Sequence, residues 1–111
     1  MSAYEWRITI ADNGSVDSTC EIAGRLADRD KRVSCTRLEE RGRGRALKYT
    51  WLNSDADMVS YMDVDLSTDL DILPYTASLV ATGECHVAVG SRLLSGSEVI
   101  GRSFKRGLIS R

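Results

Sequence analysis

Trp6-Arg7-Ile8-Thr9-Ile10-Ala11-Asp12-Asn13-Gly14-Ser15 is the stretch that decides the fold of this 111-residue chain. Residues 6–11 alternate in polarity and include β-branched side chains, which predicts a β-strand. Residues 12–15 are of types that favour a tight turn, so the strand is expected to end there. Ser18 and Glu21 have the spacing of a capping box, which predicts a helix ending near residues 28–30. The buried face of this helix is expected to comprise Ile22, Ala23, Leu26 and Ala27.

The alternation of strand and helix continues along the rest of the chain. Further strands are predicted over residues 32–38, 58–62 and 86–90. Further helices are predicted over residues 45–53, with Leu47 and Trp51 inward, from about Pro74 to Gly83, and from about Ser103. This order predicts an α/β fold with three layers, α/β/α, around a mostly parallel sheet. The length predicts one small domain over residues 1–111.

Charge is segregated along the sequence, although the net charge is only −1. Residues 55–71 hold six aspartates and no Lys or Arg, whereas residues 92–111 hold five basic residues and one acid. A second basic group surrounds the glycines of residues 41–48. An acidic centre between basic flanks suits a cation together with a polyanion, and it would repel nucleic acid, which is not expected as a partner.

The cysteines and the hydropathy indicate the compartment. Cys20, Cys35 and Cys85 are far apart and odd in number, which predicts buried or partly buried thiols in a reducing cytoplasm. No signal segment and no apolar run of about 20 residues is present, so no membrane span is predicted. We therefore expect a cytoplasmic location, with membrane contact limited to peripheral binding at the cytoplasmic face.

Asp63 and Asp65 form the acidic centre, directly after the strand predicted over residues 58–62. In open α/β sheets, ligands bind beyond the carboxyl ends of the strands. Two carboxylates there can converge on one ion, and hard oxygen ligands select Mg²⁺ or Mn²⁺ bridging a diphosphate. The predicted metal ligands, which are also catalytic candidates, are therefore Asp63 and Asp65.

The remaining site candidates surround two turns. Asp12 ends the first strand at the same edge, where its carboxylate can accept a hydrogen bond from a base N–H or a ribose hydroxyl. Gly14 permits the tight turn, and Ser15 or Asp17 can cap the following helix. The arginines beside Gly42 and Gly44, and Arg92 after the last strand, can pair with phosphate.

Four motifs in this order resemble glycosyltransferase family 2, across about residues 8–111. Residues 12–19 (Asp-Asn-Gly-Ser-Val-Asp-Ser-Thr) resemble its Asp-Asp-Gly-Ser-x-Asp-x-Thr signature, and residues 41–46 resemble its Gly-Lys-Gly-x-Ala segment. Residues 63–65 occupy the place of its Asp-x-Asp motif. Residues 90–92 (Gly-Ser-Arg) resemble the dolichyl- and polyprenyl-phosphate sugar transferase branch.

The resemblance implies a GT-A type fold, a nucleoside-diphosphate sugar donor, and Mg²⁺ or Mn²⁺. It implies that Asp12 contacts the nucleoside, with Gly14 and Ser15 in the same substrate-binding turn, and that Arg43 lies near the donor. It also implies that Asp63 and Asp65 frame the metal and that Arg92 meets a phosphate in catalysis.

The sequence departs from the family pattern at several places. Asn13 replaces the second Asp of the signature, and Ser67 stands where relatives often carry Gln. The opening strand of the family, central in its sheet, and the helices of its acceptor side have no counterpart. The expectation is thus a truncated GT-A fold lacking the first strand and the C-terminal acceptor part.

Three functions remain open from the sequence. No general base is evident, and a phosphate monoester acceptor, largely dianionic near pH 7, would need none. This favours transfer to a polyprenyl (dolichyl-type) phosphate. The alternatives are a family 2 transferase acting on a polysaccharide or cell-surface glycan hydroxyl, and a catalytically incompetent fragment that folds as a homo-oligomer through an exposed sheet edge.

Overall fold

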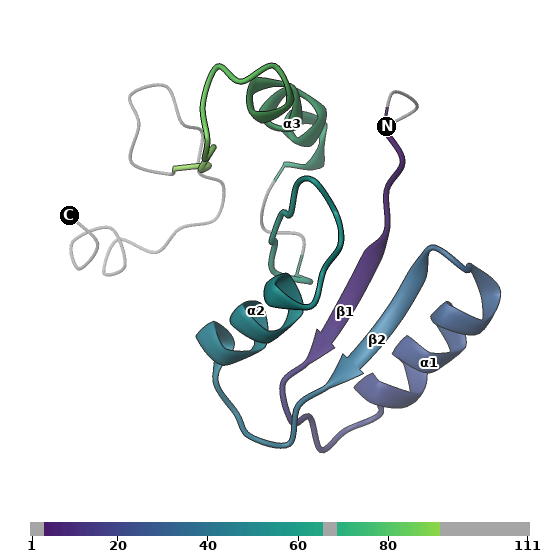
Figure 1. The fold of residues 1–111 in the computed structure, drawn as a ribbon. Helices are drawn as coiled ribbons and strands as arrows, with labels where there is room; N and C mark the ends of the chain where they lie inside the picture. Colours follow the sequence, from purple (N-terminus) through teal and green to yellow (C-terminus); the bar gives the residue numbers. More distant parts are fainter. Residues whose placement is uncertain (1–3, 66–68, 92–111) are drawn as a thin grey trace, which may run out of the picture. The chain divides into compact units, whose positions relative to one another are not determined.

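The computed structural model describes residues 4–65 and 69–91. The chain forms two compact units, residues 1–70 and 71–111, and each is described by itself. In the first unit, strands β1 (Ile8–Asp12) and β2 (Val33–Arg37) pair in parallel, with Ile8 opposite Val33 and Asp12 opposite Arg37 (Figure 1). The parallel pair confirms the predicted α/β class, and its register brings the ends of both strands to one edge.

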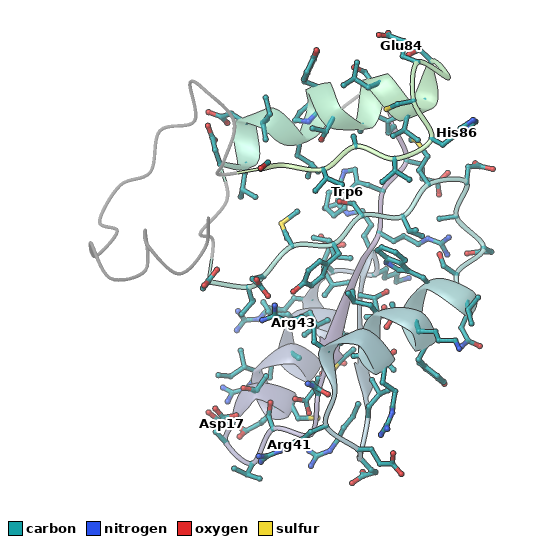
Figure 2. All side chains as sticks on the ribbon, turned by 90° about the vertical axis from the view of Figure 1, so that its left-hand side faces the viewer. Trp6, Asp17, Arg41, Arg43, Glu84 and His86 are labelled. Carbon is teal, nitrogen blue, oxygen red and sulfur yellow. The ribbon has the colours of Figure 1, made fainter. Side chains whose placement is uncertain are left out.

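Two helices enclose this sheet. Helix α1 (Thr19–Arg29) connects β1 to β2 and packs mainly on β2, whereas α2 (Arg43–Leu52) packs on β1. Figures 1 and 2 show the two helices on opposite sides of the strands. The first unit therefore has the α/β/α layering that the alternation of elements predicts.

The start of α1 differs from the predicted capping box. The Ser18 side chain makes no capping hydrogen bond; instead the Thr19 N–H donates to Oδ1 of Asp17 at 3.0 Å. A hydrogen bond from the Thr19 side chain, followed by this backbone hydrogen bond, lowers the pKa of Asp17. Glu21 pairs with Arg25 one turn later, at 2.9 Å. The Asp17 side chain therefore takes the first free N–H of the helix, and Asp17 is one of the two alternative caps that the sequence predicts.

The core of the described residues is small. Its buried hydrophobic members are Ala23 of α1 and Ala46 of α2. The prediction of larger inward side chains was wrong for three residues, since Ile22, Leu26 and Trp51 are 50%, 44% and 43% exposed. The apolar faces of α1 and α2 extend past the sheet, because two short strands are too narrow to cover them.

The strands predicted over residues 58–62 and 86–90 do not form in the structure. Both segments are described, and neither has a ladder partner. A strand is stabilised by backbone hydrogen bonds to a neighbouring strand. Alternating apolar residues do not form a strand where no such neighbour is present. Val59 and Met62 are correspondingly 44% and 38% exposed. The side chain of Asp55, just before the first of these segments, forms an ion pair with Arg7.

The described part of the second unit, residues 71–91, contains one α-helix. A single 3-10 turn, η1 (Leu70–Ile72), leads into α3 (Leu73–Ala81), with Pro74 in its first turn as predicted. Gly83 follows the helix with φ +77°, which confirms it as the residue that ends α3. The helix predicted from Ser103 lies outside the described residues. No helix among residues 4–65 and 69–91 is long and apolar enough to cross a membrane.

All three cysteines are free thiols of intermediate exposure, as predicted. Cys20 at the start of α1 contacts Cys35 of β2, on the side of the sheet that α1 covers. Burial, followed by the neighbouring Cys20, raises the pKa of the Cys35 thiol. Cys35 is therefore protonated at neutral pH and packs as a small apolar side chain.

Candidate functional site

Asp12 is a buried carboxylate at the carboxyl end of β1. Its side chain is 0% exposed. Oδ1 accepts a hydrogen bond from the Ser15 N–H at 3.1 Å, while Oδ2 is buried without a hydrogen-bond partner. The Asp12 carbonyl accepts from the Leu38 N–H at 2.8 Å, which extends the pairing past β2. A buried carboxylate oxygen without a hydrogen bond is unfavourable, so Oδ2 of Asp12 is an acceptor that a ligand donor would satisfy.

Asn13 and Gly14 hold the first turn against residues 38–42. The Gly42 N–H donates to Oδ1 of Asn13 at 2.8 Å in a partly buried contact. Gly14 has φ +69°, and a Cβ there would lie 3.3 Å from the Glu39 carbonyl oxygen. Gly42 has φ +154°, also a conformation that favours glycine. The two glycine motifs of the sequence are thus one joined structure, and Asn13 is the side chain that joins them.

Asn13→Ala is expected to destabilise the chain by about 1 kcal/mol, because the partly buried Gly42 N–H loses its acceptor. Asn13→Asp is the matched control, since a carboxylate oxygen at the same position accepts the same hydrogen bond. Urea unfolding monitored by circular dichroism measures both variants. An equal loss in Asn13→Ala and Asn13→Asp would show that the amide does not act as this acceptor.

Arg37 ends β2 directly opposite Asp12. Its Nη1 lies 3.9 Å from Oδ2 of Asp12, and its Nη2 donates to the Ser15 carbonyl oxygen at 3.4 Å. A hydrogen bond to Cys20 and then the charge of Glu39 raise the pKa of Arg37. The guanidinium therefore contacts the strand end, the turn and the start of α1 together.

Asp63 lies beside two side chains. The Tyr61 hydroxyl donates to its Oδ1, and Nη2 of Arg43 is 3.6 Å from the same oxygen. The hydrogen bond to Asp63 raises the pKa of Tyr61, with smaller contributions from the charges of Asp63 and Asp65. Arg43, labelled in Figure 2, is the first residue of α2 and is 72% exposed. The glycine-rich loop and the acidic centre are therefore linked through Arg43 and Asp63.

Asp65 follows in a turn with Val64, which is 92% exposed. Both aspartates of the motif are open to solvent. Within residues 4–65 and 69–91, no group of three or more His, Cys, Asp or Glu side chains is placed to hold a metal. Mg²⁺ in proteins is typically held by one or two carboxylates, with substrate phosphates and water completing its shell. A pair of exposed carboxylates fits an ion that arrives with its diphosphate.

Most of the predicted site residues within the described part of the chain fall into two clusters of the first unit. Asp12, Gly14 and Ser15 form one with the loop over residues 38–42, and Asp63 and Arg43 form the other. Arg92 and Ser67 lie outside the described residues.

The sequence interpretation missed the roles of three further residues. Arg37 could have been found, because it ends the second predicted strand as Asp12 ends the first. The contact of Tyr61 follows from its place two residues before Asp63. The bond from Gly42 to Asn13 had no sequence signal, since 29 positions separate the two residues.

A shallow hollow lies at the opposite, amino end of the strands, away from these residues. It is lined by residues 4–7, Lys31 and Arg32, and the Arg32 guanidinium stacks 4.0 Å from the centre of the Trp6 ring. It contains none of the predicted site residues. The candidate site is therefore defined by the charged groups at the carboxyl edge and not by this hollow.

Comparison with known proteins identifies relatives of the chain. A curated glycosyltransferase, AglD of Haloferax volcanii, is 37% identical over the full chain, which spans 18% of that protein. A dolichol-phosphate mannosyltransferase of Pyrococcus furiosus is 27% identical over the full chain, which spans 31% of it. No solved structure matches the chain. The chain thus corresponds to a minor part of the length of these two relatives.

The family is established by a match to the family as a whole. Residues 2–107 match the family described as Glycosyl transferase family 2. The match covers all four motifs that carry the resemblance in sequence, together with the parallel β-α-β unit that positions Asp12. The chain therefore belongs to glycosyl transferase family 2.

Proposed function

We propose that this chain binds the nucleoside-diphosphate sugar of a metal-dependent glycosyltransferase whose acceptor is a polyprenyl phosphate. The carrying observation is the buried Asp12 carboxylate, whose Oδ2 has no hydrogen-bond partner at the carboxyl edge of the sheet. A nucleoside that donates an N–H or O–H to this oxygen would satisfy it. Parallel sheets bind ligands beyond this edge, which supports the same assignment.

The diphosphate would lie between the glycine-rich loop and the acidic centre. Arg43 stands at the start of α2 and already faces the Asp63 carboxylate at 3.6 Å. The helix N-terminus adds a partial positive charge near the same place. Asp63 would hold the ion in place of its contact with Arg43, and the Arg43 guanidinium would then be available to a phosphate oxygen.

Asp63 and Asp65 would hold Mg²⁺ or Mn²⁺ with oxygens of the diphosphate. The bound ion supplies positive charge that stabilises the departing nucleoside diphosphate. Tyr61 keeps its proton, because its hydroxyl donates to Asp63, and so it orients that carboxylate toward the site.

The reaction would form one bond and break one. An oxygen of the acceptor phosphate attacks the anomeric carbon, and the bond from that carbon to the diphosphate oxygen breaks. A phosphate monoester is largely dianionic near pH 7, so no proton needs to be removed. The dolichol-phosphate mannosyltransferase that resembles this chain supports a lipid-phosphate acceptor. Such an acceptor would bring the protein to a membrane surface.

A melting experiment tests donor binding. Mn²⁺ with the matching nucleoside diphosphate is expected to stabilise the chain by about 2.7 kcal/mol at a ligand concentration 100-fold above Kd. Uridine, guanosine, cytidine and adenosine diphosphates are compared, each with and without the ion. A melting temperature that no nucleotide raises would contradict the proposal.

A transfer assay tests the acceptor. Labelled sugar is expected to pass from the donor to polyprenyl phosphate and not to polyprenol, the alcohol that lacks the phosphate. Transfer to polyprenol or to a glycan hydroxyl would instead place the protein among transferases that require a general base.

A further inference from the structure

We propose that Arg37 is the counter-ion that covers the unpaired oxygen of Asp12 and yields it to the donor, so that Arg37 sets the affinity for the nucleoside. The proposal rests on the proposed function, because it assigns the nucleoside to Asp12. It makes Arg37 a positioning residue, which acts through the Asp12 carboxylate.

Burial places Arg37 on the outside of Asp12. The Arg37 side chain is 44% exposed, whereas the Asp12 side chain beneath it is 0% exposed. The two residues are register partners at the last position of the paired strands. Of these two charged groups, the guanidinium is therefore the one that solvent reaches.

The distances from the Arg37 guanidinium to its partners show that it contacts Asp12 only weakly. Nη1 of Arg37 is 3.9 Å from Oδ2 of Asp12, which is an ion pair but too long for a hydrogen bond. The guanidinium also contacts the Ser15 carbonyl oxygen at 3.4 Å and Glu39 at 3.7 Å, and it forms a hydrogen bond with Cys20. Arg37 compensates the charge of Asp12 without satisfying its lone pair.

This arrangement sets up a competition. A donor N–H placed at about 2.9 Å from Oδ2 would make the hydrogen bond that Arg37 does not make. Arg37 has an alternative partner in Glu39, whose side chain is 88% exposed. The Arg37 side chain can therefore turn outward and keep an ion pair. Binding of the nucleoside weakens the ion pair between Arg37 and Asp12. The free energy of that ion pair therefore reduces the free energy of nucleoside binding.

The experiment compares Arg37→Gln with the wild type, both without ligand and with the nucleoside diphosphate plus Mn²⁺. Arg37→Gln is expected to lower the melting temperature of the free chain and to decrease the Kd of the nucleotide about threefold, in keeping with a half-exposed ion pair. Arg37→Lys keeps the charge and is expected to restore both values toward the wild type. Arg25→Gln, which breaks an exposed pair on α1, is the control that leaves the Kd unchanged.

A double-mutant cycle supplies a readout without nucleotide. Arg37→Gln is expected to destabilise the chain when Asp12 is present and to have little effect in an Asp12→Asn background, since no charge then needs compensation. Equal destabilisation in both backgrounds would overturn the proposal. An increased Kd in Arg37→Gln would also overturn it, because Arg37 would then bind the donor itself. If the wild type binds no nucleotide, the proposed function fails, and the cycle alone decides whether Arg37 is the counter-ion of Asp12.

Discussion

Asp65→Ala is expected to abolish the rise in melting temperature that Mn²⁺ and a nucleoside diphosphate give together. The substitution removes one of two exposed carboxylates that follow residues 58–62. A hard divalent ion held by two carboxylates loses half of its protein ligands, and the remaining Asp63 is also the partner of Tyr61 and Arg43. Differential scanning fluorimetry with and without Mn²⁺ measures the effect.

The control for this variant is Asp57→Ala. Asp57 is an exposed aspartate of the same acidic stretch, eight positions earlier, and it should leave the ligand-induced shift unchanged. The free chain should melt at nearly the same temperature in both variants, since exposed substitutions change stability by about 0.5 kcal/mol or less. If Asp65→Ala kept the full ligand-induced rise in melting temperature, Asp63 and Asp65 would not be the metal ligands.

Gly14→Val is expected to give the largest loss of stability among single changes at the site. The glycine has φ +69°, a conformation that costs a β-branched residue about 1–3 kcal/mol. The new Cβ would also meet the Glu39 carbonyl oxygen at 3.3 Å and Cγ of Arg41 at 3.4 Å. Because this turn also carries Asp12 and Ser15, nucleotide binding should be lost together with stability. Urea unfolding and a nucleotide titration measure the two effects.

Gly24→Ala is the matched control for Gly14→Val. Gly24 lies within α1, and a Cβ there meets nothing within 4 Å. Alanine favours a helix over glycine by about 1 kcal/mol, so this variant should be as stable as the wild type or more so. A Gly14→Val chain that is as stable as Gly24→Ala would mean that the turn does not require a positive φ.

The sequence predicted well what local residue types determine. The alternation in residues 6–11 and the turn residues after it located β1, and Gly83 located the end of α3. The position of Asp12 at the carboxyl edge followed from the same pattern. These features depend on backbone preferences within a few residues, which a single sequence carries.

The features that depend on residues far apart in the chain could not be predicted from the sequence. The segment over residues 58–62 has the composition of a strand, yet it has no ladder partner among the described residues. The bond between Asn13 and Gly42 and the ion pair between Asp12 and Arg37 each depend on β1 lying beside β2. Ser18 and Asp17 were both suitable caps, and only the three-dimensional path of the turn selects Asp17.

The most direct test is a crystal structure of the chain with Mn²⁺ and the nucleoside diphosphate, in which anomalous scattering locates the manganese. We predict one peak between the carboxylates of Asp63 and Asp65, with diphosphate oxygens completing its shell and the nucleoside donating to Asp12. A nucleotide bound elsewhere, or a manganese peak with the two carboxylates turned away from it, would contradict the assignment of this edge as the donor site.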